Sequence, residues 1–162
     1  MKSDILYPTK LAREILRVSN TRLQYLVLKQ ITSPEDKSLG TGSTRKFSFS
    51  NIMEMGIANQ LASTKIPIEF VRSIILLSKE QAPYLFTLEM EDVDRGSSDS
   101  NTVLCVKFLG GLDHPITIEA VIGSHASIQC DLSTKRIDGS PYLVIDLGIL
   151  SNRLRQELRS RS

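Results

Sequence analysis

Five polar side chains that can recognise another molecule by hydrogen bonding lie close together near the start of the chain. They are Asn20, Thr21, Arg22, Gln24 and Tyr25. A guanidinium group can donate two hydrogen bonds to a guanine, and a carboxamide can pair with an adenine in the same two-bond manner. We therefore interpret Asn20, Arg22 and Gln24 as candidate readers of bases. We expect the Tyr25 hydroxyl to contact a backbone phosphate.

Cationic side chains flank this stretch on both sides, and positive charge on one surface releases counterions from nucleic-acid phosphates. The candidates for phosphate contacts are Lys10, Arg13, Arg17, Arg45 and Lys46. Ser19 lies at an expected helix start, where free backbone amides can also bind a phosphate. For each cation taken singly the alternative is a solvated surface residue. For Tyr25 the alternative is a half-buried position in the core.

Residues suited to catalysis or metal binding show no spacing that would assemble a site. His114, His125, Cys105 and Cys130 lack the paired spacings of zinc sites, and we expect the two cysteines to be small buried apolar residues. The acidic residues at 89–99 do not form a positioned carboxylate pair. The sequence therefore predicts a protein that is not an enzyme and that uses no metal or other cofactor.

Two short helices must position the polar stretch. Thr9 is expected to cap the first helix, which should stop near Arg17, with Arg13 and Arg17 on its outward side. Ser19 is expected to cap the second helix. The inward face of this second helix should consist of Leu23, Leu26 and Val27.

A loop with Gly40 and Gly42 then leads to Arg45 and Lys46, an arrangement that suits a wing, meaning a hairpin-like loop beside the second helix. A surface loop without any partner is the alternative. Two further helices follow. The third should begin at Ser48 or Ser50, run to about Thr64 and stack Met53, Ile57 and Leu61, and the fourth should have Pro67 in its first turn and end at Pro83.

After Pro83 the pattern changes to short runs rich in β-branched and apolar residues, which favour strands. We predict strands at 85–91, 102–108, 116–122, 126–130 and 142–147. A basic helix is predicted over 148–161, with Ile149, Leu150, Leu154 and Leu158 on one side. The predicted fold class is therefore α+β: helices first, then a small, mainly antiparallel sheet with a terminal helix.

The charge of the chain is distributed unevenly, although its net value is only +2. Residues 1–82 carry 12 Lys and Arg against 7 Asp and Glu, and residues 83–150 carry 4 against 10. Residues 151–162 carry 4 against 1. This asymmetry suggests two units, 1–82 and 83–162, with different partners.

The 41% hydrophobic and 23% charged composition is typical of globular proteins. No apolar run is long enough to span a bilayer, and the first residues lack the features of a signal peptide. Two cysteines do not make a disulfide framework in a chain of 162 residues. We expect a cytoplasmic protein without a membrane partner.

Several short motifs occur in the order found in MerR-type winged helix-turn-helix proteins. The sequence has Thr9, Glu14, Leu16, Val18 and Ser19, then Leu23-Gln24-Tyr25, then Arg45, Phe47, Ser48, Asn51 and Ile52, and finally residues 66–72, which end at Arg72. Residues 9–77 therefore resemble the MerR-type winged helix-turn-helix and, more loosely, its excisionase-like relatives. The resemblance implies that residues 1–82 form a DNA-binding domain.

The chain also departs from this family. Leu26 stands where many members have a second aromatic residue, and Val27 and Leu28 replace a usual Glu-Arg pair. Arg17 and Gln30 stand where the family commonly has glycines, in the helix-turn-helix turn and after the recognition helix. No long heptad-bearing helix follows residue 80, so we expect any homodimer to form through residues 83–162.

The resemblance implies a sequence-specific transcriptional regulator that binds double-stranded DNA. Its expected DNA contacts are Arg17, Ser19, Asn20, Thr21, Arg22, Gln24, Tyr25, Arg45 and Lys46. Residues 83–162 would mediate self-association or sense an effector whose identity the sequence does not give. Two alternatives remain open: a docking platform for another protein, as the apolar residues 26–28 suggest, and an excisionase-like architectural factor that bends DNA.

Overall fold

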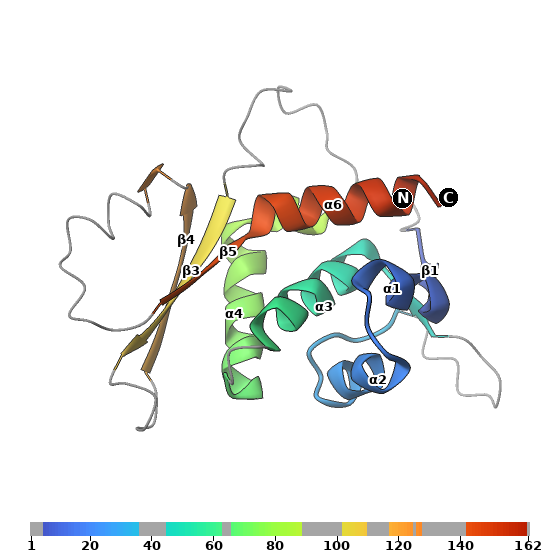
Figure 1. Ribbon diagram of the computed structural model, residues 1–162, viewed down its shortest axis with the longest axis horizontal. Coiled ribbons are helices and arrows are strands. Elements are labelled where there is room, and N and C mark those ends of the chain that lie inside the picture. Colours follow the sequence, from blue (N-terminus) through green and yellow to red (C-terminus); the bar gives the residue numbers. More distant parts are fainter. Residues whose placement is uncertain are drawn as a thin grey trace.

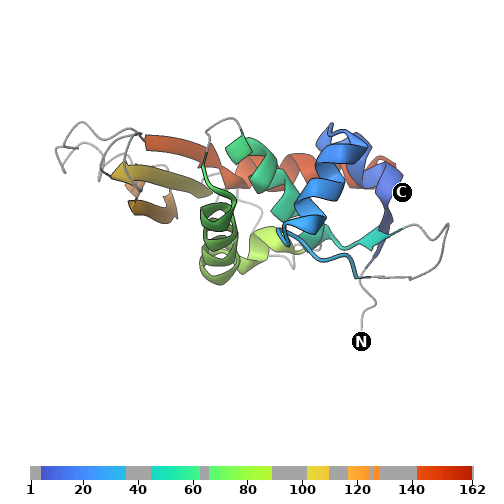
Figure 2. The same ribbon diagram turned by 90° about the horizontal axis from the view of Figure 1, so that it is seen from below.

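The computed structural model describes residues 5–35, 45–62, 66–88, 102–109, 117–124, 126–127 and 142–161. Within these ranges helices and strands are mixed, and the strands form two small antiparallel sheets (Figure 1). The predicted α+β class is confirmed. Figure 2 shows the helix α2 at the opposite end of the molecule from the three-stranded sheet.

The first sheet joins the start of the chain to the far side of the glycine-containing loop. Strand β1 (Tyr7–Pro8) pairs with β2 (Lys46–Phe47), with Tyr7 opposite Phe47. Helix α1 (Thr9–Leu16) begins directly after β1, so its N-cap is Pro8 and the prediction of Thr9 as the cap is wrong. The Thr9 hydroxyl donates instead to the Arg45 carbonyl at 3.0 Å, because the strand pairing brings that carbonyl within its reach.

The turn between α1 and α2 (Asn20–Leu28) lies where it was predicted, after a first helix that stops near Arg17, although α2 already includes Asn20. Arg17 ends α1 in the left-handed region, with φ 54° and ψ 42°, and the Val18 amide donates to the Arg13 carbonyl at 3.1 Å. The Ser19 hydroxyl accepts a hydrogen bond from the Arg22 amide at 3.1 Å. Ser19 is therefore the N-cap of α2, as predicted, and satisfies one of the free amides of its first turn.

Helix α3 (Phe49–Leu61) begins with a reciprocal capping box, since the Ser48 hydroxyl accepts from the Asn51 amide at 3.3 Å and the Asn51 side chain accepts from the Ser48 amide at 3.1 Å. Ser48 is thus the cap, and the helix ends three residues before the predicted Thr64. Helix α4 (Ile68–Gln81) has Pro67 as its N-cap, one position before the predicted first turn. Met53, Ile57 and Leu61 of α3 are buried, as expected.

The segment after α4 differs from the prediction. Pro83–Phe86 forms a 3₁₀ helix, η2, where a strand was expected to begin at residue 85. The carbonyls of this turn are used by α6 (Leu147–Arg159): Arg155 donates to the Tyr84 carbonyl at 2.7 Å and to the Thr87 carbonyl at 3.1 Å. These hydrogen bonds hold the segment against α6 in place of a strand partner. The rest of this predicted strand, 89–91, lies outside the described residues.

The second sheet has the order β4-β3-β5 and is antiparallel throughout. Its strands are β3 (Thr102–Leu109), β4 (Thr117–Ser124) and β5 (Tyr142–Asp146), which confirms three of the five predicted strands. Residues 126–127 are helical, because the Ser124 hydroxyl accepts from the Ser127 amide at 3.2 Å and turns the chain. The prediction of a strand there is wrong for these two residues, and 128–130 lie outside the described residues.

Helix α6 lies along α3 and contacts α1, so it covers the N-terminal helices (Figure 1). Leu150, Leu154 and Leu158 are buried, as predicted, but Ile149 is 60% exposed, because it is not on the helix face formed by residues four apart. The backbone of Gly56 in α3 lets α6 approach closely, since a Cβ at this position would lie 3.3 Å from the nearest side-chain carbon of Leu154.

One apolar core unites these elements, from Tyr7 in β1 to Leu158 in α6. The inward face of the sheet contributes Leu104, Val106 and Ile145. Core contacts therefore cross the boundary predicted between residues 82 and 83, and the division into two units stays a prediction.

Candidate nucleic-acid interface

Helix α2 is held by a narrow apolar face. Leu23 and Leu26 are buried, and Val27 is half-buried, so the expected inward residues do face the core. The opposite side carries polar residues. Asn20, Thr21 and Gln24 are exposed on the first two turns, as predicted.

Arg22 differs from the other four polar residues. It is half-buried, and its Nη2 donates to the Ala58 carbonyl of α3 at 3.5 Å. Its guanidinium lies 5.4 Å from the centre of the Tyr25 ring, and the Lys29 ammonium lies 6.0 Å from that ring. Arg22 was predicted as a base reader, but its guanidinium lies against α3 and the Tyr25 ring, so it is not freely exposed as Asn20 and Gln24 are. The spacing of three residues between Arg22 and Tyr25 was the signal in the sequence for this stacking.

Tyr25 itself is 38% exposed, so it is neither fully outward nor part of the core. Two cationic groups, those of Arg22 and Lys29, lie close to its ring, which keeps positive charge at the surface around it. Lys29 is exposed and belongs to this group, although the sequence analysis did not single it out.

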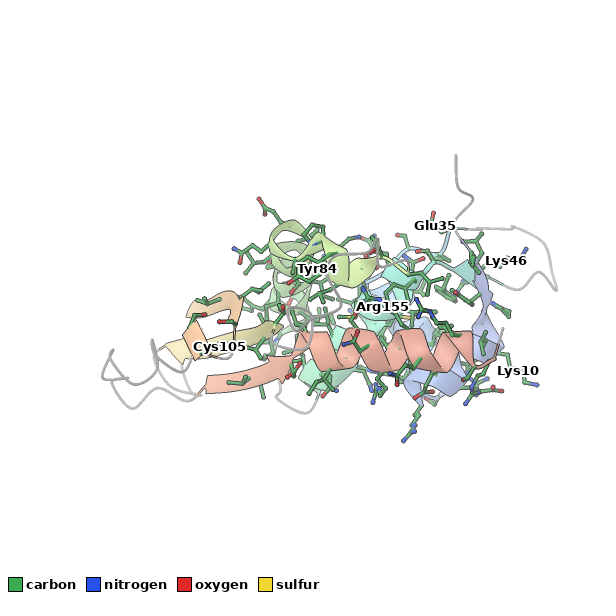
Figure 3. The ribbon with its side chains drawn as sticks, turned by 90° about the horizontal axis from the view of Figure 1, so that it is seen from above. Lys10, Glu35, Lys46, Tyr84, Cys105 and Arg155 are labelled. Atoms are coloured by element: carbon green, nitrogen blue, oxygen red, sulfur yellow. The ribbon has the colours of Figure 1, made fainter. Side chains whose placement is uncertain are left out.

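The cations expected near phosphates occupy the same end of the molecule. Lys10, Arg17, Arg45 and Lys46 are exposed, whereas Arg13 is half-buried. Figure 3 shows Lys10 and Lys46 at the end away from Cys105, which belongs to the three-stranded sheet. The backbone around them is fixed, since the Glu35 amide donates to the Lys46 carbonyl at 3.1 Å. Gly40 and Gly42, expected at the tip of the wing, lie outside the described residues.

The acidic residue on α1 is neutralised locally. Glu14 accepts from Arg161 at 2.9 Å, so its carboxylate does not stand unopposed beside the exposed cations. Since both partners are largely exposed, this ion pair affects the local potential more than the stability of the fold.

The backbone at Arg17 and Gln30 has an unusual conformation that bears on the family resemblance. Both residues have positive φ values, 54° and 56°, and they are the two positions where the family commonly has glycine. Left-handed backbone is the conformation for which glycine is favoured. Both residues thus adopt a backbone conformation that suits glycine although each carries a side chain.

A polar cavity of about 470 Å³ lies between the segment after α2 and the helices α3 and α4. Its lining includes Thr32, Asn51, Glu54 and Lys79. The Lys79 ammonium binds the buried Glu54 carboxylate at 2.7 Å, so the two charges neutralise each other. The candidate DNA contacts on α2 do not line this cavity.

Within the part of the chain that the structure describes, no group of His, Cys, Asp and Glu side chains is close enough to hold a metal ion. Cys105 is buried, as expected for a small apolar residue. Cys130, His114 and His125 lie outside the described residues. Among the described helices none combines the length and apolar character needed to cross a membrane.

The comparisons with known proteins gave no matching family model and no similar curated protein.

Proposed function

We propose that this chain binds double-stranded DNA in a sequence-specific manner and regulates transcription. The observation that carries the proposal is the outward face of α2. A capped helix of nine residues is fixed by Leu23 and Leu26 and leaves Asn20, Thr21 and Gln24 exposed near its N-terminus. In helix-turn-helix proteins the N-terminal residues of the second helix contact base edges in the major groove.

Base reading rests mainly on Asn20 and Gln24 in this proposal, because their carboxamides can form paired hydrogen bonds with adenine. Arg22 lies against α3 through its hydrogen bond to the Ala58 carbonyl, so we assign it to holding α2 rather than to reading a guanine. Tyr25 and Lys29 would contact phosphates beside the groove.

Phosphate binding rests on the exposed cations Lys10, Arg17, Arg45 and Lys46. These side chains come from α1, the following turn and the segment around β2, at the end of the molecule that also holds α2 (Figure 1). Each phosphate that is neutralised releases counterions, so affinity should fall steeply with salt. The left-handed backbone at Arg17 and Gln30 supports a helix-turn-helix identity independently of charge.

The test begins with selection of bound sequences from a random DNA pool, followed by fluorescence anisotropy over a salt series. Arg45→Ala should weaken binding to all sequences and reduce the salt slope by about one unit. Gln24→Ala should lower affinity for the selected site by about 1–3 kcal/mol and relax the preference at one base pair. Arg153→Ala, which removes an exposed cation from α6, is the matched control and should change neither quantity.

A wild-type protein without salt-dependent affinity for DNA would refute the proposal. A selected site made of two inverted half-sites, together with a dimer mass in light scattering, would support the homodimer.

A docking platform is the second candidate, and one observation favours it. Leu28 at the end of α2 is 78% exposed, so this end of the helix offers an apolar side chain that a protein partner could cover. Leu28→Glu separates the two functions: DNA affinity should persist if α2 reads DNA through its first turns, and a protein partner that binds the apolar end of α2 should be lost. A bending assay would distinguish an architectural factor from a regulator.

A further inference from the structure

Arg72 on α4 binds the C-terminal end of α2. Its Nε donates to the Lys29 carbonyl at 3.1 Å, and its Nη2 donates to the same oxygen. Lys29 is the C-cap of α2, so the guanidinium lies at the negative end of the helix dipole. One side chain therefore links two helices whose contacting residues are 43 positions apart in the sequence.

The end of α2 is also closed by its own backbone. The Gln30 amide donates to the Val27 carbonyl and the Ile31 amide donates to the Leu26 carbonyl, both at 2.9 Å. With Gln30 in the left-handed region, this is the hydrogen-bond pattern of a Schellman motif. Ile31 is buried and ties this motif to the core. The Lys29 carbonyl is the group that Arg72 reaches beside the motif.

The backbone at Arg72 is firmly held in the core, whereas α2 is held by few buried side chains. Val71, Ile74 and Ile75 on α4 are buried in the core, so the backbone beside Arg72 is firmly held. By contrast, α2 has nine residues and only two fully buried side chains, Leu23 and Leu26. A small rotation about these two leucines would displace the outward residues Asn20 and Gln24.

We propose that Arg72 is a positioning residue: it sets the direction in which α2 is presented and does not itself contact DNA. This inference rests on the proposed DNA binding. A guanidinium can direct two N–H groups at one oxygen in a fixed plane, whereas the ammonium of lysine acts as a single flexible point charge. Lysine at position 72 should therefore keep the charge and lose the positioning.

The first measurement needs no DNA. Hydrogen exchange of the backbone amides of residues 29–31 is compared in the wild type, Arg72→Ala and Arg72→Lys. Exchange should be faster in both variants than in the wild type, with Arg153→Ala as the unchanged control. Equal exchange in all four proteins would overturn the positioning role, whether or not the protein binds DNA.

The second measurement compares affinity for a selected duplex with affinity for a random duplex, over a salt series. Both Arg72 variants should lower this ratio by about ten-fold, and the salt slope should stay at its wild-type value. A phosphate contact would give the opposite result: a smaller slope in Arg72→Ala that Arg72→Lys restores. An unchanged ratio in Arg72→Ala would also refute the inference.

A wild type that shows no salt-dependent DNA affinity in this second measurement refutes the proposed function. The exchange experiment then still decides whether Arg72 fixes α2.

Discussion

Arg17 and Gln30 adopt backbone conformations that residues with a β-carbon avoid. The cost of left-handed backbone is roughly 1–2 kcal/mol for a non-glycine residue. In each case the surrounding structure compensates: Val18 closes the turn after Arg17 by its hydrogen bond to Arg13, and Ile31 buries its side chain after Gln30. Both side chains are exposed, so neither contributes to the packing of the core. In the proposed function, Arg17 contributes its charge to phosphate binding.

Replacing either residue by glycine should stabilise the fold. Arg17→Gly and Gln30→Gly should each raise the free energy of unfolding by about 0.5–1 kcal/mol, because glycine adopts positive φ without steric cost but loses more entropy on folding. Urea unfolding measures the change. Gln24→Gly, within the regular part of α2, is the control and should lower stability by about 1 kcal/mol. If Arg17→Gly were more stable and also bound DNA as tightly as the wild type, Arg17 would have no role at the phosphates.

Tyr7 makes stability sensitive to alkaline pH. Burial raises the pKa of its hydroxyl above the ordinary 10.0, because the charged form is poorly solvated in the core. The folded state therefore retains a proton that the unfolded state loses, and this contribution to stability is present below pH 10 and lost as the pH rises beyond it. Tyr7→Phe should show a smaller decline in the free energy of unfolding above pH 10 in urea unfolding, because it has no hydroxyl to ionise.

Residues whose partners lie within one turn were predictable, and residues whose partners lie far away were not. Ser19 and Ser48 cap helices through amides three residues on, so the sequence identified Ser19 and narrowed the cap of α3 to Ser48 or Ser50. Thr9 instead binds the Arg45 carbonyl, 36 positions away, and Arg22 is drawn toward Ala58, also 36 positions away. Both contacts depend on how β2 and α3 pack against the first two helices. Cap residues and apolar periodicity in the sequence do not reveal that packing.

Whole elements show the same difference between local and distant partners. Helix α6 was predicted from its apolar spacing, but that it covers α1 and α3 was not. That contact explains why residues 85–86 are not a strand: Ser151 donates to the Leu85 carbonyl at 2.9 Å, and Arg155 binds the neighbouring carbonyls. Figure 3 labels Arg155 of α6 and Tyr84 of η2, whose carbonyl Arg155 binds. The backbone of a short, largely apolar run such as 85–88 can form its hydrogen bonds with any element that packs against it. The local pattern therefore could not distinguish a strand from a helical turn.

The α3–α6 contact depends on the absence of a side chain at Gly56. Gly56→Leu should lower the free energy of unfolding by about 1–3 kcal/mol, because Leu150 and Leu154 leave no room for four added carbons. Thermal or urea unfolding gives the value. Asn59→Leu adds a leucine at an exposed position of the same helix and should change stability by less than about 0.5 kcal/mol. Equal effects of the two substitutions would contradict the close approach of α3 and α6.

At the scale of the whole molecule, one continuous core predicts cooperative unfolding. Apolar residues from β1, the four N-terminal helices, the sheet and α6 belong to the same cluster. Calorimetry should show a single transition whose calorimetric and van't Hoff enthalpies agree. Two resolved transitions would instead support independent units on either side of residue 82 and would contradict a shared core.

The position of α6 also has a consequence for synthesis on the ribosome. Its buried leucines complete the core that α1 and α3 begin, yet they are made about 100 residues later than Gly56, on which two of them pack. At a synthesis rate of about 5–20 residues per second, the apolar face of the N-terminal helices stays uncovered for several seconds. During this interval the nascent chain presents to chaperones a surface that the finished protein buries. An mRNA truncated before the codon for Leu147 would give a protein without α6, in which that surface stays exposed until the protein is degraded.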